Sequence, residues 1–233
     1  MARQGAEASV PQGGIGLIFH GIGTPGRTLE PGEQPYWLDT ATFETILDRI
    51  AASPLRRTFR LSFDDGNASD HDIALPRLAA RGLTADFFVL TGRIGQPGSL
   101  SADQVLALQS AGMRIGSHGI GHLDLRLLDD PALAEELSAS RQALEQICGR
   151  PVTALGIPFG AYDRRVLQAV RAAGYEEAFS SDRGRMRPGA FPAPRTSLVA
   201  GMTSQALEAT LAGRLSPLVR LRRAAGRAKR RWF

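Results

Sequence analysis

The feature that most constrains the fold of this chain is a regular alternation of short apolar runs with longer stretches of helical periodicity. The short runs are bounded by glycine and polar residues, as buried strands are, whereas the longer stretches repeat apolar residues every three or four positions. Strands alternating with helices favour a parallel sheet covered by helices, so we predict one α/β domain shaped as a barrel or near-barrel. The predicted strands cover residues 15–19, 59–65, 85–90, 113–116, 152–157 and 177–180, with a weaker one near Leu198, and the predicted helices cover residues 40–50, 73–81, 101–112, 129–148 and 163–173.

Length and charge fit a single domain with a basic appendage. With 233 residues, 43% of them hydrophobic, the chain is long enough for one large core, and it shows no internal repeat or linker. Eight of the 28 Lys and Arg residues lie from Arg214 onward, where there is no acid, so the first 213 residues carry 20 basic and 23 acidic side chains. We therefore expect a flexible N-terminus over residues 1–14, a barrel domain over 15–213 and a basic amphipathic tail over 214–233.

Five chemically distinctive residues each lie where a predicted strand ends and a loop to a helix begins. In folds with parallel strands and covering helices, the edge where strands end and loops to helices begin is where ligands bind. The topology would bring these five residues to that common edge. They are His20, Asp64, Asp65, His118 and Phe159.

Two adjacent carboxylates, Asp64 and Asp65, end the second predicted strand and precede Gly66. Successive side chains of a strand point to opposite faces, so both can enter one site only if the backbone turns there, which Gly66 permits. Two anions this close are tolerable when a cation sits on one and leaves the other free to act as a base. A solvated Asp-Asp-Gly turn is the alternative interpretation.

Two histidines, His118 and His122, lie four positions apart. On a helix they would share a face, but Gly119 and Gly121 between them favour a tight loop instead. No glutamate follows His118, so the zinc-protease helix signature is absent. Together with Asp65 the pair forms a two-histidine, one-carboxylate set, which leaves coordination positions open for water and substrate.

Three segments resemble, in order and spacing, the motifs of the polysaccharide deacetylases with NodB homology, carbohydrate esterase family four. The resemblance covers residues 15 to 200, and it implies a distorted barrel of about seven βα units. The segments are Ser62-Phe63-Asp64-Asp65-Gly66, Ile115-Gly116-Ser117-His118 with His122, and Pro158-Phe159-Gly160.

Carried over to this chain, the resemblance implies hydrolysis of an N-acetyl group on an amino sugar of a polysaccharide or lipid-linked glycan precursor, with release of acetate. Asp65, His118 and His122 would bind a divalent metal, with zinc as the first expectation and cobalt, manganese, nickel or iron as alternatives. Asp64 would be the general base. The oxyanion would be held by the metal and by the backbone N–H near Phe159, which follows Pro158.

The chain departs from the family pattern at two functional positions. Many members have a catalytic histidine late in the domain, but no histidine follows His122 here. In branches that resemble the biofilm poly-N-acetylglucosamine deacetylases, a histidine after the first strand takes that place. His20 fits this position. The arginine expected two residues before Pro158 is replaced by Gly156. Arg195 could reach Asp64 from the last strand, and a surface arginine is the alternative.

Aromatic residues in the loop after His20 have two interpretations. Tyr36 and Trp37 could stack on a sugar ring or anchor that loop on the barrel, and we favour anchoring.

The basic tail suggests a location. A helix with apolar residues every three or four positions and many arginines suits an anionic membrane surface, whereas a disordered basic end is the alternative. Residues 1–14 lack the basic-then-apolar run of a secretory signal, and the single Cys148 requires no oxidising compartment. We therefore expect a cytoplasmic protein, peripheral at the inner membrane face through Arg214–Phe233. No nucleic-acid partner is expected, because the body is acidic and has no base-reading motif.

Two other functions stay open from the sequence. One is a catalytically inactive relative that binds glycans, which the loss of the arginine at position 156 keeps in view. The other is a metal-dependent amidase that acts on a small non-sugar amide.

Overall fold

The computed structural model describes residues 14–215 of the chain. The expected flexible N-terminus lies outside this part except for Gly14, and the expected tail helix lies outside it except for Arg214 and Leu215. Within residues 14–215, none of the helices combines the length and the apolar character needed to cross a bilayer.

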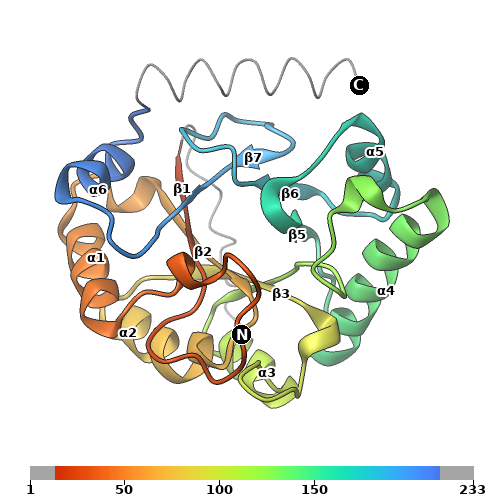
Figure 1. The fold of residues 1–233 in the computed structure, drawn as a ribbon, viewed down its shortest axis with the longest axis horizontal. Helices are drawn as coiled ribbons and strands as arrows, with labels where there is room; N and C mark the ends of the chain where they lie inside the picture. Colours follow the sequence, from red (N-terminus) through yellow and green to blue (C-terminus); the bar gives the residue numbers. More distant parts are fainter. Residues whose placement is uncertain (1–13, 216–233) are drawn as a thin grey trace, which may run out of the picture.

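Within residues 14–215, eight parallel strands form one sheet that curves into a nearly closed barrel (Figure 1). Their order is β7-β6-β5-β4-β3-β2-β1-β8. The outermost strands β7 and β8 are separated in sequence only by Arg195, so one short segment brings the two edges of the sheet together. The prediction of a distorted α/β barrel in a single domain is confirmed. The strands are β1 (Ile15–Phe19), β2 (Phe59–Asp65), β3 (Ala85–Val89), β4 (Arg114–Ser117), β5 (Ala154–Gly156), β6 (Glu177–Ser180), β7 (Ala193–Pro194) and β8 (Thr196–Ser197).

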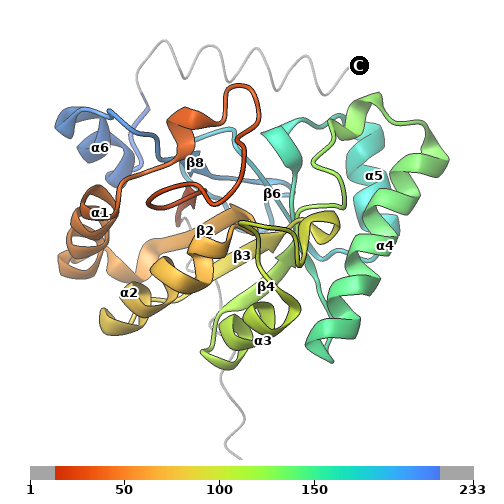
Figure 2. The ribbon, with the colours of Figure 1, turned by 60° about the horizontal axis from the view of Figure 1, so that its bottom comes forward.

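In the described part of the chain, six α-helices surround the strands (Figures 1 and 2). Side-chain caps start most of them: Asp39 accepts a hydrogen bond from the backbone N–H of Thr42, and Ser101 forms a reciprocal capping box with Gln104. The helices are α1 (Thr40–Ala52), α2 (Leu75–Ala80), α3 (Ala102–Ser110), α4 (Asp130–Cys148), α5 (Arg164–Ala172) and α6 (Ser204–Leu211).

The main hydrophobic core lies between the sheet and the helices. Phe19, Phe63 and Phe87 occupy paired positions on β1, β2 and β3, and their rings stack with centroid distances of 5.0 and 4.8 Å. Phe43 of α1 packs edge-on against Phe19 at 5.1 Å. These contacts fix the helix-facing side of the three strands.

The inner face of the sheet carries the intervening residues. Because neighbouring residues of a strand point to opposite faces, Ser62 and Asp64 of β2 face away from Phe63 and into the barrel. A smaller apolar cluster on other strands and the loop before β7 accompanies them: Phe88, Ala154, Phe179 and Met186. Asp64 is therefore held inside the barrel, where only 4% of it is exposed.

The structure differs from the predicted elements mainly after residue 180. The weak strand expected near Leu198 lies two residues earlier as β8, and β7 and α6 were not predicted. Two-residue strands carry no periodicity, and α6 has no fully buried residue and only Leu207 and Leu211 packed against the core, so its apolar pattern is short. The helix expected over residues 73–81 starts earlier, with a π-helical turn over Asp70–Ala74 before α2.

Candidate metal centre

The end of β2 turns at its last residue. Asp65 has a φ angle of +81°, in the left-handed region that side chains other than glycine rarely adopt, and Gly66 follows with +71°. The predicted turn is therefore present, but it begins at Asp65 and not only at Gly66. Asp64 and Asp65 are both almost fully buried, so the alternative of a solvated turn is wrong.

The structure brings Asp65, His118 and His122 together. Oδ1 of Asp65 lies 3.4 Å from Nε2 of His118 and 3.6 Å from Nε2 of His122. One ligand atom from each residue lies within 4.8 Å of the others, and Oδ1 of Asp65 is buried with no hydrogen-bond partner among the described residues. A carboxylate oxygen and two imidazole nitrogens converging on one point fit a divalent cation.

The loop after β4 presents the two histidines. Gly119 and His122 have φ angles of +87° and +54°, so the segment is a loop and not a helix, as the intervening glycines predict. Glu136 of α4 holds it, because Oε1 accepts hydrogen bonds from the backbone N–H groups of Ile120 and Gly121 at 2.7 and 2.8 Å. These contacts of Glu136 join two segments far apart in sequence and could not be predicted from the sequence.

His118 is oriented by the sheet itself. Its Nδ1 donates to the backbone oxygen of Gly156 at 2.7 Å, which leaves Nε2 facing Asp65. A Cβ at position 156 would come within 2.8 Å of Phe88 and 3.1 Å of His118 Nδ1. The glycine found in place of the family's arginine is therefore required by the packing around His118.

His122 takes its orientation from a residue that the sequence did not indicate. Its Nδ1 donates to Oε2 of Glu30 at 3.0 Å, and its ring lies 4.2 Å from that of Phe159. Burial and the neighbouring His118 lower the pKa of His122, which favours the neutral ring that a metal requires. Glu30 lies in an irregular loop without periodicity, so a single sequence gives no signal for this contact.

Asp64 is paired with Arg195. Nη1 and Nη2 of the guanidinium donate to the two carboxylate oxygens at 2.7 and 2.9 Å, and Nη1 also donates to Oγ of Ser62 at 2.7 Å. Arg195 is 1% exposed, so the surface alternative is wrong. Burial alone would raise the pKa of Asp64, but Arg195, together with His118 and His20, lowers it, so that the pKa lies below its usual value.

Asp65 also stays ionised. Burial raises its pKa, but the close approach of His118, together with His20 and His122, brings the pKa well below its ordinary range. His20, at the end of β1, therefore shares the electrostatic environment of both carboxylates, since it also lowers the pKa of Asp64.

The aromatic residues near the site differ in role. Trp37 is 5% exposed, and its indole N–H donates to Oε1 of Glu33 at 3.2 Å, which fits the predicted anchoring of the loop. The ring of Tyr36 lies 4.8 Å from that of His20. Phe159, with a φ angle of +57°, is 59% exposed after the buried Pro158.

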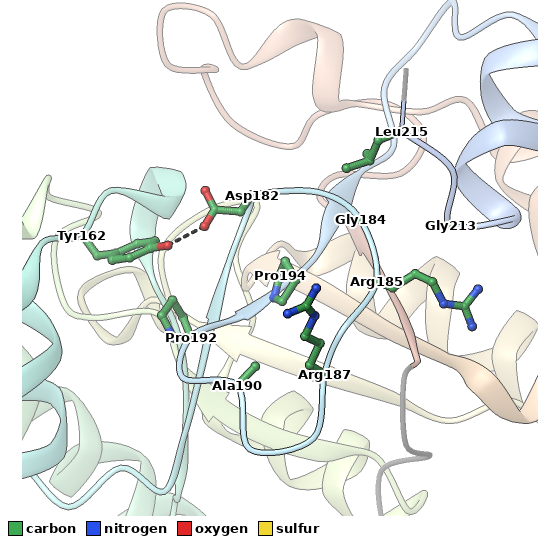
Figure 3. Close-up of a pocket in the computed structure, with 10 residues that line it drawn as sticks. All are labelled: Tyr162, Asp182, Gly184, Arg185, Arg187, Ala190, Pro192, Pro194, Gly213 and Leu215. Carbon is green, nitrogen blue, oxygen red and sulfur yellow. Dashed lines mark hydrogen bonds between the residues drawn. The ribbon is translucent and has the colours of Figure 1, made fainter. Parts of the chain in front are cut away.

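A separate cavity of about 450 Å³ lies beside the segment between β6 and β7 (Figure 3). Tyr162 donates to Asp182 across one side of it, and Arg185 and Arg187 come from the loop that borders it. None of the three converging side chains of the candidate metal centre lines this cavity.

Comparisons with known proteins agree on one family. The family model described as polysaccharide deacetylase matches residues 52–178, more than half of the chain. YxkH of Bacillus subtilis, whose name places it among polysaccharide deacetylases, is 24% identical over 207 residues, which are 83% of this chain and 74% of that protein. A chitin deacetylase of Pestalotiopsis is 29% identical over 126 residues, which are 54% of this chain and 42% of that protein.

Solved structures share the fold. The deacetylase PplD of Streptococcus pyogenes, in complex with acetate, superposes with a TM-score of 0.73 at 21% identity, covering 86% of this chain and 99% of that one. IcaB of Ammonifex degensii gives a TM-score of 0.68 at 19% identity, covering 86% of this chain and 96% of that one. At these identities the likeness establishes the barrel.

Proposed function

The chain belongs to the polysaccharide deacetylase family, whose members are deacetylase hydrolases, and from that premise we propose that it removes the acetyl group from an N-acetylated amino sugar of a glycan with the help of a divalent metal ion. One observation carries the proposal. The buried, unpartnered Oδ1 of Asp65 faces Nε2 of His118 and Nε2 of His122. These three side chains would hold the metal.

A divalent cation bound there would lower the pKa of a water molecule and polarise the acetamide carbonyl. Zinc suits two imidazoles and one carboxylate, and cobalt, manganese, nickel and iron are the other candidates. Both imidazoles are prepared for it, because each Nδ1 is occupied by a hydrogen bond and each Nε2 faces Asp65.

Asp64 is the proposed general base. As the water oxygen attacks the acetyl carbon, a carboxylate oxygen of Asp64 would accept the water's proton. Arg195 holds both oxygens of this carboxylate, which keeps it ionised and fixes its direction. The developing oxyanion would accept a hydrogen bond from the backbone N–H near Phe159.

His20 is the proposed general acid. The carbon–nitrogen bond breaks to give acetate and an amine, and the leaving nitrogen needs a proton, which an imidazole can donate near neutral pH. His20 directly follows β1, which pairs with the strand that carries both aspartates. Its Nδ1 has no hydrogen-bond partner among residues 14–215.

The substrate class and the location are proposed together. An amino sugar in an exopolysaccharide or in its lipid-linked precursor would suit an enzyme at the cytoplasmic face of a membrane, and the eight basic residues from Arg214 onward would attract anionic lipids.

Metal content and acetate release test this function. We expect purified protein to bind a divalent metal and to release acetate from N-acetylglucosamine oligomers. Asp64→Asn should keep the metal and lose at least about 100-fold in kcat, because only the proton acceptor is gone. His118→Ala should lose both metal and turnover.

Three outcomes would redirect the assignment. An active Asp64→Asn enzyme would refute the proposed base. Bound metal with no acetate from any glycan would favour an amidase for small non-sugar amides. Glycan binding without metal or turnover would mean an inactive relative.

A further inference from the structure

We propose that Glu30 is a positioning residue for His122 and that it couples the order of the β1–α1 loop, residues 20–39, to metal binding. The inference rests on the proposed metal centre and adds to it a residue outside the family motifs. Figure 2 shows this loop lying across the end of the sheet where the strands terminate.

The two histidines of the centre are held in different ways. His118 donates to the backbone oxygen of Gly156, so its orientation belongs to the rigid sheet. His122 lies in a loop, and its Nδ1 donates to a side chain, Glu30 Oε2 at 3.0 Å. An ionised carboxylate only accepts hydrogen bonds, so Nδ1 carries the proton and Nε2 is left free towards Asp65.

Apart from Nε2 facing Asp65 at 3.6 Å, the other contacts of His122 are ring contacts that do not fix its orientation. Phe159 lies 4.2 Å away but is 59% exposed, and the ring of His118 is 5.5 Å away. Neither contact selects a tautomer. The hydrogen bond to Glu30 therefore decides which nitrogen faces the metal.

Glu30 is itself held from two sides. Its Oε1 pairs with Arg93, which follows β3, and its backbone N–H donates to Oε2 of Glu33 at 2.8 Å. Glu33 in turn pairs with Arg27, whose Nη2 donates to Oδ1 of Asn67 at 3.0 Å.

Asn67 lies two residues after Asp65, so these contacts join the loop to the strand end that carries the third metal ligand. The loop touches two of the three ligand-bearing segments through named polar contacts. If loop order and metal binding are coupled, bound metal favours the ordered loop by the same factor by which the ordered loop raises metal affinity. A bound metal fixes His122 and so gives Glu30 a fixed donor, and an ordered loop holds His122 ready for the metal.

Metal affinity of the whole chain tests the positioning role. Competition between the protein and a chelator for Co²⁺ or Zn²⁺ should show 10- to 100-fold weaker binding in Glu30→Ala, about the loss expected for removing the outer partner of a ligating histidine. Glu30→Gln should lie between the two, because its amide oxygen can still accept from Nδ1. At saturating Co²⁺, the visible absorption band of Glu30→Ala should shift, since the ring of His122 is no longer fixed.

Glu44→Ala is the matched control. Glu44 is also paired with an arginine, Arg77, and its side chain is 40% exposed against 44% for Glu30, but it lies on α1. Its loss should leave metal affinity and the Co²⁺ spectrum unchanged.

Amide hydrogen exchange tests the coupling. Metal should slow exchange in residues 24–36 of the wild type and of Glu44→Ala, and much less in Glu30→Ala. If Glu30→Ala does not fold, metal affinity and amide hydrogen exchange are both measured on Glu30→Gln instead.

The inference is overturned if Glu30→Ala and Glu30→Gln bind metal within twofold of the wild type, or if metal leaves the loop's exchange unchanged. Failure of the proposed function looks different: the wild type would bind no metal, or His118→Ala would bind it equally well.

Discussion

Three buried carboxylates lie at the end of β2 and in the turn after it, and their partners give them different states. Asp64 is ion-paired with Arg195, and Asp65 faces two imidazoles. Asp70 is fully buried, and neither of its oxygens has a hydrogen-bond partner among the described residues. Burial, with the nearby charges of Asp65 and Asp64, raises the pKa of Asp70 well above its usual value.

Asp70→Asn should therefore change how stability depends on pH. The folded state keeps a proton on Asp70 that the unfolded chain loses above about pH 4. Asp70 therefore makes the free energy of unfolding fall as the pH rises above about 4, until the folded-state carboxyl also loses its proton. In metal-free protein, the variant should match the wild type near pH 4 and exceed it at pH 8 by about 1 kcal/mol or more. Urea unfolding at both values measures this.

Asp48→Asn serves as the control for that experiment. Asp48 is 65% exposed and its pKa is lowered by a hydrogen bond with Arg81, so it should not alter the slope above pH 5. An Asp70→Asn protein with the slope of the wild type would contradict the raised pKa.

At the scale of elements, the segment from β7 to β8 has two tasks. It joins the edges of the sheet, and its one intervening residue, Arg195, reaches inward to Asp64 and Ser62. The guanidinium also lies over the ring of Phe88 at 4.8 Å, so its position is fixed from several sides.

Arg195→Met should move the pH dependence of activity. Without the guanidinium, burial dominates and the pKa of Asp64 rises, so the base becomes protonated at a higher pH. The acidic limb of kcat/KM should shift upward, with a lower plateau because the carboxylate is no longer aligned. A pH–rate profile measures both effects. Arg195→Lys, which keeps the charge and loses the two-pronged contact, should shift the limb less; an unshifted limb in Arg195→Met would refute the assignment of the base.

The sequence predicted those elements whose signal is local. Apolar alternation located β1, β2 and β6, and capping residues such as Asp39 located helix starts. β7 was not predicted and β8 was expected two residues too late, because each has only two residues and is defined by pairing with a strand far along the chain.

The same distinction holds within the site. Asp65, His118 and His122 form a recognisable residue pattern, and the structure places them together. For Arg195 the sequence leaves two alternatives open, contact with Asp64 or a place on the surface, because only closure of the sheet brings it to Asp64. Glu30 was missed, because its contact with His122 spans 92 residues between two irregular loops.

For the molecule as a whole, charges fill one end of the barrel interior. Arg60 of β2 pairs with Asp86 of β3 at 2.5 Å and with Glu177 of β6 at 2.6 Å, and Arg114 of β4 also contacts Glu177. The candidate metal centre lies at the opposite end, where the strands terminate. The overall positive charge comes from the residues after Gly213, because the first 213 residues carry 20 basic and 23 acidic side chains.

Removal of residues 214–233 should release the protein from anionic membranes. Each basic residue near such a surface contributes about 1 kcal/mol, so the full chain should sediment with phosphatidylserine vesicles at low salt and the shortened chain should not. Neutral vesicles are the control. Equal sedimentation of both proteins would remove the proposed membrane association, and the acetate-releasing activity on soluble oligomers should be the same in both.

The position of Arg195 also has a consequence for how the enzyme matures. A molecule in which β7 and β8 have not docked beside β6 and β1 would lack the counter-ion of Asp64, the proposed base, even with the other proposed catalytic side chains in place. The segment that closes the barrel is the same one that brings the counter-ion to the proposed base, so we expect a molecule with an open barrel to be inactive.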